Sequence, residues 1–104
     1  LGGLPKTATV VQSSAATLSP LATDSGTIYI LDCSSNQIDV TIPQQTAAGT
    51  QWVFMSINAT NNVIITPTSA TINGGPSKTI DTQYNALTVV SDGTGVTSNY
   101  YAIG

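Results

Sequence analysis

Short apolar stretches separated by polar turns recur along most of the chain. Residues 38–42 read Ile-Asp-Val-Thr-Ile and are followed by Pro43, so apolar and polar positions alternate strictly. Successive side chains of a strand point to opposite faces, and this pattern therefore predicts a strand with one buried and one wet face. Residues 51–57 read Gln-Trp-Val-Phe-Met-Ser-Ile and are apolar on both faces. That stretch predicts a central strand, or one that lies at a subunit interface.

The other apolar stretches are rich in the β-branched and aromatic residues that favour strands. We expect strands at residues 27–33, 63–66, 70–72, 78–80, 86–91 and 99–103. Residues 27–33 and 38–42 are predicted to pair as a hairpin, and so are 51–57 and 63–66.

Two clusters of turn residues separate the later strands. Asn73-Gly74-Gly75-Pro76 precedes residues 78–80, and Asp92-Gly93-Thr94-Gly95 follows residues 86–91. Asn-Gly and Asp-Gly are strong signals for tight turns, because both residues tolerate positive φ.

The chain divides into two parts by composition. Residues 1–24 are rich in Gly, Pro, Ser, Ala and Thr and predict an extended N-terminal arm with at most one short strand; disorder is the alternative. Residues 25–104 carry many short strands at spacings of about 8 to 12 residues. This spacing predicts an all-β domain, an antiparallel β-sandwich or small barrel of jelly-roll-like form. No repeat of the solenoid type is visible, so a stacked array is not expected.

Charge is scarce in this chain. Charged residues make up 7%, the cations are Lys6 and Lys78, and Arg, Glu and His are absent. Nucleic-acid binding needs clustered cations, so we expect no nucleic-acid partner. The apolar stretches are too short to cross a bilayer, and there is no polybasic patch, so we expect no membrane partner either. Few charges also leave strand edges unguarded, and we expect neighbouring subunits to cover them.

Candidate chemistry is sparse because neither His nor Glu is available. Asp32 and Asp39 flank the first predicted hairpin and form the nearest approach to a paired-carboxylate site, although two solvated edge charges explain them more simply. Asp24, Asp81 and Asp92 could contribute oxygens to a Ca²⁺ site, but no segment has the required carboxylate density. We therefore expect no enzyme activity, no catalytic residue, no metal and no cofactor.

Cys33 is the chain's single cysteine, so no intrachain disulfide is possible. A small apolar residue buried in a strand is the expected role, with interchain pairing as the alternative. Asn58-Ala59-Thr60 is a glycosylation sequon in a predicted turn, and an ordinary turn is the simpler interpretation.

The large aromatic residues are the candidates for a subunit interface. Trp52 and Phe54 share one face of their strand, and we favour them over Val53 and Met55; Tyr100 is the third candidate. Tyr100 and Tyr101 should point to opposite faces. Core packing and a carbohydrate-stacking platform are the alternative roles for these side chains.

Turn and apolar positions follow a characteristic order from about residue 24 to the end. The order runs Gly26-Thr-Ile-Tyr-Ile-Leu-Asp32, Val40-Thr-Ile-Pro43, Ala47-Ala-Gly49, Trp52 to Ile57, Val63-Ile-Ile-Thr-Pro67, Ile72-Asn-Gly-Gly75, Ile80, Tyr84, Leu87-Thr-Val-Val-Ser-Asp-Gly93 and Tyr100-Tyr-Ala-Ile103. It resembles a module of tailed-bacteriophage structural proteins, found in tail fibres, tail spikes and head decoration or fibre proteins. The chain departs from it at Asn73, where Asp is usual, and at Tyr100-Tyr101, where a Trp is usual.

The resemblance implies an antiparallel β-fold that forms a homotrimer and projects from a virus particle. The expected function is that of a non-enzymatic virion structural protein on the outer surface, either a capsid decoration protein or a head fibre. Its partners would be its own copies and the major capsid protein or other virion proteins. The alternative is a tail fibre or spike module that binds a host-surface receptor or glycan through the loops at residues 58–62 and 92–98.

Overall fold

The computed structural model describes residues 7–58, 60–94 and 98–104. Within these residues the protein is almost entirely β-structure, with a single short 3₁₀ turn, so the all-β prediction is confirmed. In chain order the elements are β1 (Val10–Ser13), β2 (Thr17–Leu18), η1 (Ala22–Asp24), β3 (Ile28–Asp32), β4 (Ile38–Ile42), β5 (Gln51–Asn58), β6 (Val63–Pro67), β7 (Thr71–Ile72), β8 (Lys78–Ile80), β9 (Ala86–Ser91) and β10 (Asn99–Ile103).

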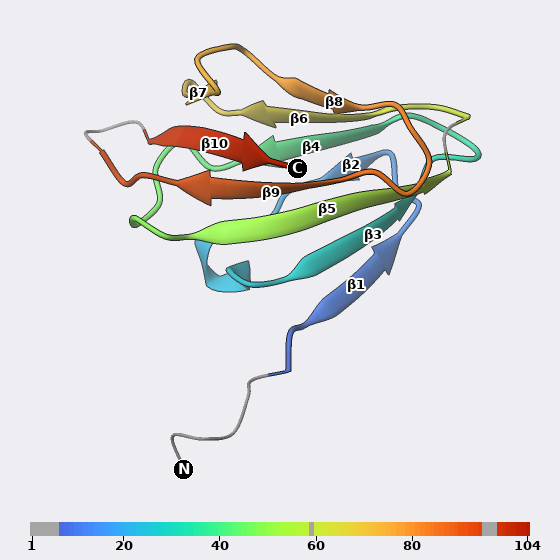
Figure 1. Ribbon diagram of the computed structural model, residues 1–104, viewed down its shortest axis with the longest axis horizontal. Coiled ribbons are helices and arrows are strands. Elements are labelled where there is room, and N and C mark those ends of the chain that lie inside the picture. The colour runs from blue at the N-terminus through green and yellow to red at the C-terminus, as the bar shows by residue number, and fades with distance from the viewer. Residues whose placement is uncertain (1–6, 59, 95–97) are drawn as a thin grey trace.

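The strands form two sheets that pack face to face (Figure 1). The larger sheet has the strand order β1-β3-β5-β9-β10-β7, and the smaller sheet has the order β2-β4-β6-β8. From β1 to β6 the chain alternates between the sheets, and the strands that meet in each sheet run parallel. The pairs β1–β2, β3–β4 and β5–β6 are therefore successive coils of a short β-solenoid.

The coils stack in register although they differ in length. In the larger sheet Val10 pairs with Ile28, 18 positions later, and Ile28 pairs with Val53, 25 positions later. In the smaller sheet the corresponding steps are 22 and 25, from Thr17 to Asp39 and from Ile38 to Val63. Because the turns absorb these differences, no fixed period appears in the sequence, which explains why a stacked array was not expected.

Antiparallel pairing is confined to the C-terminal part of the fold. There β8 runs antiparallel to β6, β9 to β5, and β10 to β9. The predicted antiparallel sandwich or jelly roll is therefore wrong for the stacked coils. The two predicted hairpins are also wrong, because β3 and β4, like β5 and β6, lie in different sheets.

Both predicted turns before the last strands form, as far as the structure describes them. At the first, Ile72 and Gly75 exchange two backbone hydrogen bonds of 2.9 Å, while Asn73 and Gly74 have φ of 50° and 78°. Positive φ at both central residues is the signature of a type I′ turn, which Asn-Gly favours. At the second, β9 and β10 run antiparallel on either side of the turn; Gly95 lies outside the described residues.

The predicted N-terminal arm is largely part of the fold. β1 pairs with β3 and β2 pairs with β4, so residues 10–18 supply an edge strand to each sheet. Pro20 is fully buried, and the Leu21 carbonyl accepts a 3.1 Å hydrogen bond from the Trp52 indole. A boundary at residue 24 thus cuts through the first coil, and the sequence missed this because the first coil has short strands and few apolar residues.

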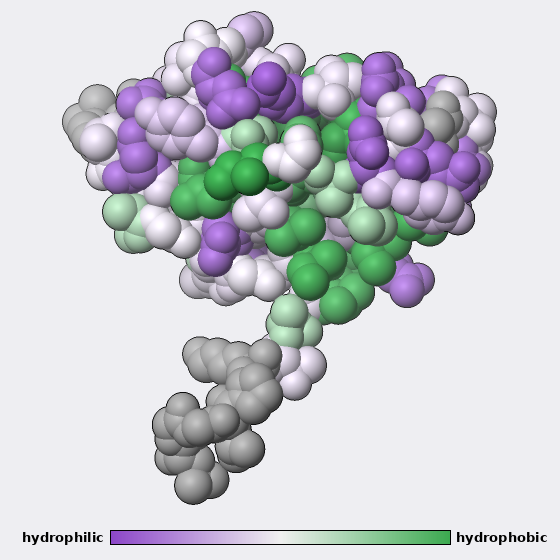
Figure 2. All heavy atoms as spheres, viewed as in Figure 1, coloured by the Kyte–Doolittle hydropathy of each residue, from purple (hydrophilic) through white to green (hydrophobic). Residues whose placement is uncertain are grey.

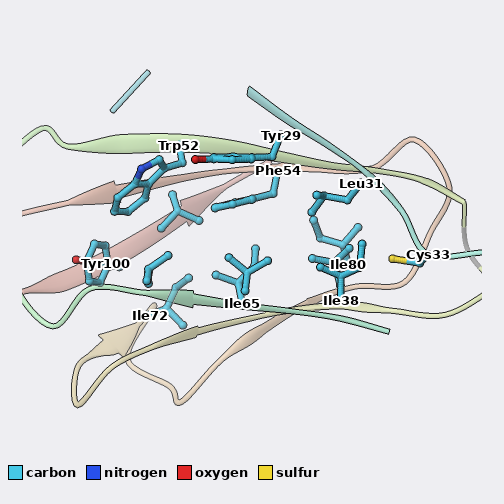
Figure 3. Packing of buried hydrophobic residues seen from close by; sticks show 14 residues of the cluster. Tyr29, Leu31, Cys33, Ile38, Trp52, Phe54, Ile65, Ile72, Ile80 and Tyr100 are labelled. Atoms are coloured by element: carbon cyan, nitrogen blue, oxygen red, sulfur yellow. The ribbon is translucent and has the colours of Figure 1, made fainter. Parts of the chain in front are cut away.

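The core lies between the sheets and is lined by the inner side of each strand (Figure 3). Tyr29 and Phe54 stack with their ring centroids 5.3 Å apart, and Trp52 lies 6.0 Å from Tyr100. From the smaller sheet Ile38, Val40 and Ile42 point into this core while Asp39 and Thr41 are exposed, as the alternation predicted. Large aromatic side chains of the larger sheet thus pack against branched aliphatic side chains of the smaller one.

Neighbouring residues of β4 should differ sharply in their response to a charge. Val40 is fully buried and Thr41 is exposed. We expect Val40→Asp to lower the free energy of unfolding by several kcal/mol, because it buries an unpaired carboxylate, and Thr41→Asp to cost on the order of 0.5 kcal/mol. Urea denaturation of both variants measures the difference, and equal costs would refute the register of β4.

The integration of β1 can be tested with a second matched pair. Val11 packs against the core from the inner side of β1, whereas Gln12 is exposed on the outer side. We expect Val11→Asp to shift the urea midpoint down clearly more than Gln12→Asp does. An arm independent of the domain would leave the midpoint unchanged in both variants.

Candidate functional site

The two carboxylates considered for catalysis do not form a pair. Asp39 is exposed on the outer side of the smaller sheet, and Asp32 lies at the end of β3 on the outer side of the larger sheet. Each carboxylate makes a hydrogen bond to a residue two positions away in the chain. Asp32 Oδ1 accepts a 2.9 Å bond from the Ser34 N–H, and Asp39 Oδ1 accepts a 2.8 Å bond from Gln37 Nε2. The core therefore separates the two groups that a hydrolase would need on one side of a substrate.

The carboxylates considered for Ca²⁺ also lie apart. No group of three metal-ligating side chains occurs in the part of the chain that the structure describes. Asp92 has its own role in the β9–β10 hairpin, where its Oδ1 accepts hydrogen bonds from the Thr94 N–H, the Thr94 hydroxyl and the Asn99 N–H at 2.9–3.1 Å. These hydrogen bonds lower the pKa of Asp92, and the bond from the Thr94 N–H has the largest effect. The role of this carboxylate is thus to hold the loop between β9 and β10.

A buried polar cluster ties the segment after β4 to the last two strands. The Tyr100 hydroxyl donates a 2.7 Å hydrogen bond to the Pro43 carbonyl and lies 3.1 Å from Thr46 Oγ1. Ser91 and Ser98 both donate to the Thr46 carbonyl, at 3.2 and 3.1 Å. Among the described residues every buried side-chain nitrogen and oxygen has a hydrogen-bond partner. The cluster thus satisfies itself, and burial raises the pKa of Tyr100 above its ordinary value.

The three interface candidates all lie inside the subunit. Trp52, Phe54 and Tyr100 have no exposed surface, and Figure 3 shows them packed between the sheets. We therefore correct their expected role from subunit contact to core packing, and the same burial removes them from a carbohydrate platform. The pattern of residues 51–57 did not show which side faces inward. The large side chains of Trp52 and Phe54 fill the space between the two sheets, so Val53 and Met55 lie on the outer side of the strand.

Tyr101, by contrast, is 49% exposed, so Tyr100 and Tyr101 do point to opposite faces as predicted. Tyr101 lies on the outer side of the larger sheet. The only sequence feature that pointed to an apolar surface there is the pattern of residues 51–57, which are apolar on both sides of their strand.

The outer side of the larger sheet is predominantly apolar, and we call it the apolar face. Figure 2 shows hydrophobic residues gathered over β1, β3, β5 and β9. By strand register the face is formed by Val10, Gln12, Ile28, Ile30, Asp32, Gln51, Val53, Met55, Ile57, Thr71, Ala86, Thr88, Val90, Asn99, Tyr101 and Ile103. Val10 and Ile103 are 53% and 64% exposed.

Strand pairing arranges the apolar face in rows that run across the strands. One row joins Val10, Ile28, Val53, Thr88 and Ile103, which pair successively from β1 to β10. Side chains at paired positions lie about 5 Å apart and form a continuous ridge. Four of these five residues are apolar and Thr88 is the polar exception, so the row carries apolar surface across five strands, which scattered exposed side chains would not do.

The outer side of the smaller sheet has the opposite character. Its outward positions are mainly hydroxyl-bearing or charged: Thr17, Asp39, Thr41, Thr66 and Thr79, with Ile64 as the apolar exception. This contrast shows which side of the molecule carries surface that is costly to leave in water.

Charges are placed away from the middle of the apolar face. Asp32 lies at its margin, Asp24 lies in η1, Asp81 and Asp92 lie in connections, and Lys78 belongs to the smaller sheet. Lys6 lies outside the described residues. A partner that covers the middle of this face would therefore bury no ionised group.

Comparison with known proteins adds no identity: no family model matches the chain, and a search of curated proteins finds no match. The described residues also contain no helix of the length and hydrophobicity that crossing a membrane requires.

Cys33 is buried, as predicted, although it lies just after the end of β3 and not in the strand. Its side chain has no exposed surface, and burial raises the pKa of the thiol above its ordinary value. Since the thiolate is the reactive species, we expect a thiol reagent such as dithionitrobenzoate to modify Cys33 far more slowly in the folded protein than in about 6 M guanidinium. Equal rates under both conditions would contradict the burial.

Proposed function

We propose that this chain is a non-enzymatic structural protein of a virus particle, carried on its outer surface as a capsid decoration protein or head fibre. The observation that carries the proposal is the apolar face, a connected surface that only association can remove from water. The resemblance of residues 24–104 to phage structural modules supplies the viral context. Following that resemblance, we propose a homotrimer that attaches to the major capsid protein or to other virion proteins.

Three further features support a structural role. Asp32 and Asp39 lie in different sheets, and the described residues hold no group of three metal-ligating side chains. Their buried polar groups are all engaged in internal hydrogen bonds. Charge is so scarce that attachment must rest on apolar contacts and on hydrogen bonds from Thr, Ser, Asn and Gln. Such a surface suits permanent packing better than rapid electrostatic capture of a soluble ligand.

The geometry gives less support to the tail fibre or spike alternative. The receptor loops proposed for it, residues 58–62 and 92–98, follow the ends of β5 and β9, and these strands are antiparallel. The two loops therefore extend from opposite ends of the sheet and do not form one binding site; Ala59 and residues 95–97 lie outside the described residues.

Imaging of the particle tests the proposal directly. In particles of the virus that encodes this chain, we expect electron cryomicroscopy or gold-labelled antibody to place it on the outer surface of the head. Detection only at the tail tip would favour the fibre alternative, and absence from purified particles would reject the virion assignment.

Salt provides a second readout on the same particles. Because few charges are available for attachment, we expect raising the salt from about 0.05 M to about 0.5 M to release little bound protein. Full release would show that ionic contacts dominate attachment.

A further inference from the structure

We propose that the apolar face is covered by further copies of this same chain. The inference deepens the proposed function by naming the surface of self-association, and it rests on that function for the association of copies but not for a trimer, because one face that meets itself forms a two-fold pair. The face offers a second copy what a stable contact between identical chains needs: connected apolar area, an absence of opposing charge, and polar groups that can pair with themselves.

The size of the face fits a contact between subunits. Five adjacent strands at about 4.8 Å spacing and about five residues of paired length give a surface of about 24 by 17 Å, or about 400 Å² in projection. Projection understates accessible area, because side chains stand out from the sheet. Two such faces together therefore approach the about 1,000 Å² that marks a specific interface.

The charge distribution favours a copy over a charged partner. The formal net charge is −3, so copies repel one another at most of their surface. The middle of the apolar face is free of this repulsion, because Asp39 lies on the opposite side of the molecule and Asp32 lies at the margin. Two copies can thus meet along this face without burying or opposing carboxylates, whereas a charged partner would find no complementary ion there.

The polar residues on the face are of types that pair with themselves. Gln12, Gln51 and Thr88 stand among the apolar rows. Amides and hydroxyls both donate and accept hydrogen bonds, so each can pair with an amide or hydroxyl of the other copy. Interfaces between identical subunits are also more apolar than most other protein contacts, and this face has that composition.

Analytical ultracentrifugation of the whole chain and two outward-facing variants tests the inference. We expect the wild type to associate into multiples of 10.6 kDa at micromolar concentration. Val53→Glu places a carboxylate in the central row and should weaken association at least about 100-fold, leaving a folded monomer. Met55→Lys is the second variant and should also weaken association. In the monomer its long stem can lie on apolar surface while the ammonium stays in water, so the variant should still fold.

Matched controls carry the same changes on the other side of the molecule. Thr41→Glu and Thr66→Lys lie at exposed positions of the smaller sheet and should leave the oligomer unchanged. Circular dichroism checks that each variant retains its β-structure. A wild type that remains at 10.6 kDa up to about 100 µM, or face variants that associate as tightly as the controls, would overturn the inference. A monomeric wild type would also remove the homotrimer from the proposed function, whereas the location of the chain on particles is decided separately by imaging.

Discussion

Parallel pairing makes the two sheets of this protein depend on each other. Two parallel neighbours cannot be joined by a tight turn, because the chain must return to the side from which the first strand started. Here the return path from β3 to β5 is β4, a strand of the opposite sheet, and the return from β4 to β6 is β5. Neither sheet can form without the other, and their inner sides are brought together by the course of the chain itself.

The aromatic core follows from this arrangement. Side chains at paired positions on successive coils stack on one another, so Tyr29 of β3 meets Phe54 of β5, its register partner. Antiparallel strands β8 and β9 then close the last coil on both sheets. The Trp52 indole N–H donates a hydrogen bond to the Leu21 carbonyl, and the Tyr100 hydroxyl donates one to the Pro43 carbonyl. These bonds tie two connecting segments to the core and give the buried indole and hydroxyl groups the partners that they need.

Sequence patterns predicted the strands well but not their pairing. Alternation at residues 38–42 identified the buried side of β4, because period and burial are local properties of one strand. Whether two strands pair depends on contacts between distant parts of the chain. The short connections after β3 and β5 could have led to hairpins, but both cross to the other sheet. Unequal coils also hid the register from any search for a repeat.

The candidate site was predictable only halfway for a related reason. Residues 51–57 showed that both sides of the strand are apolar, but the side that faces inward depends on the volume between the sheets. Trp52 and Phe54 fill that volume, which leaves Val53 and Met55 on the outside. The charge-poor composition, by contrast, could be read at once, and it led to the expectation that neighbouring subunits cover the strand edges.

The unequal coils make the connections of this fold adjustable. From β1 to β3 the register step is 18 residues and from β3 to β5 it is 25, yet the stacked strands remain aligned. Added residues therefore leave the sheet as loops at its ends, where lengthening costs little because the entropy of closure grows slowly with length. Peptides inserted between β3 and β4, at the exposed Ser34 and Ser35, should be displayed at the rim while the scaffold keeps its shape, whereas the connection from β4 to β5 is held by the buried cluster around Thr46.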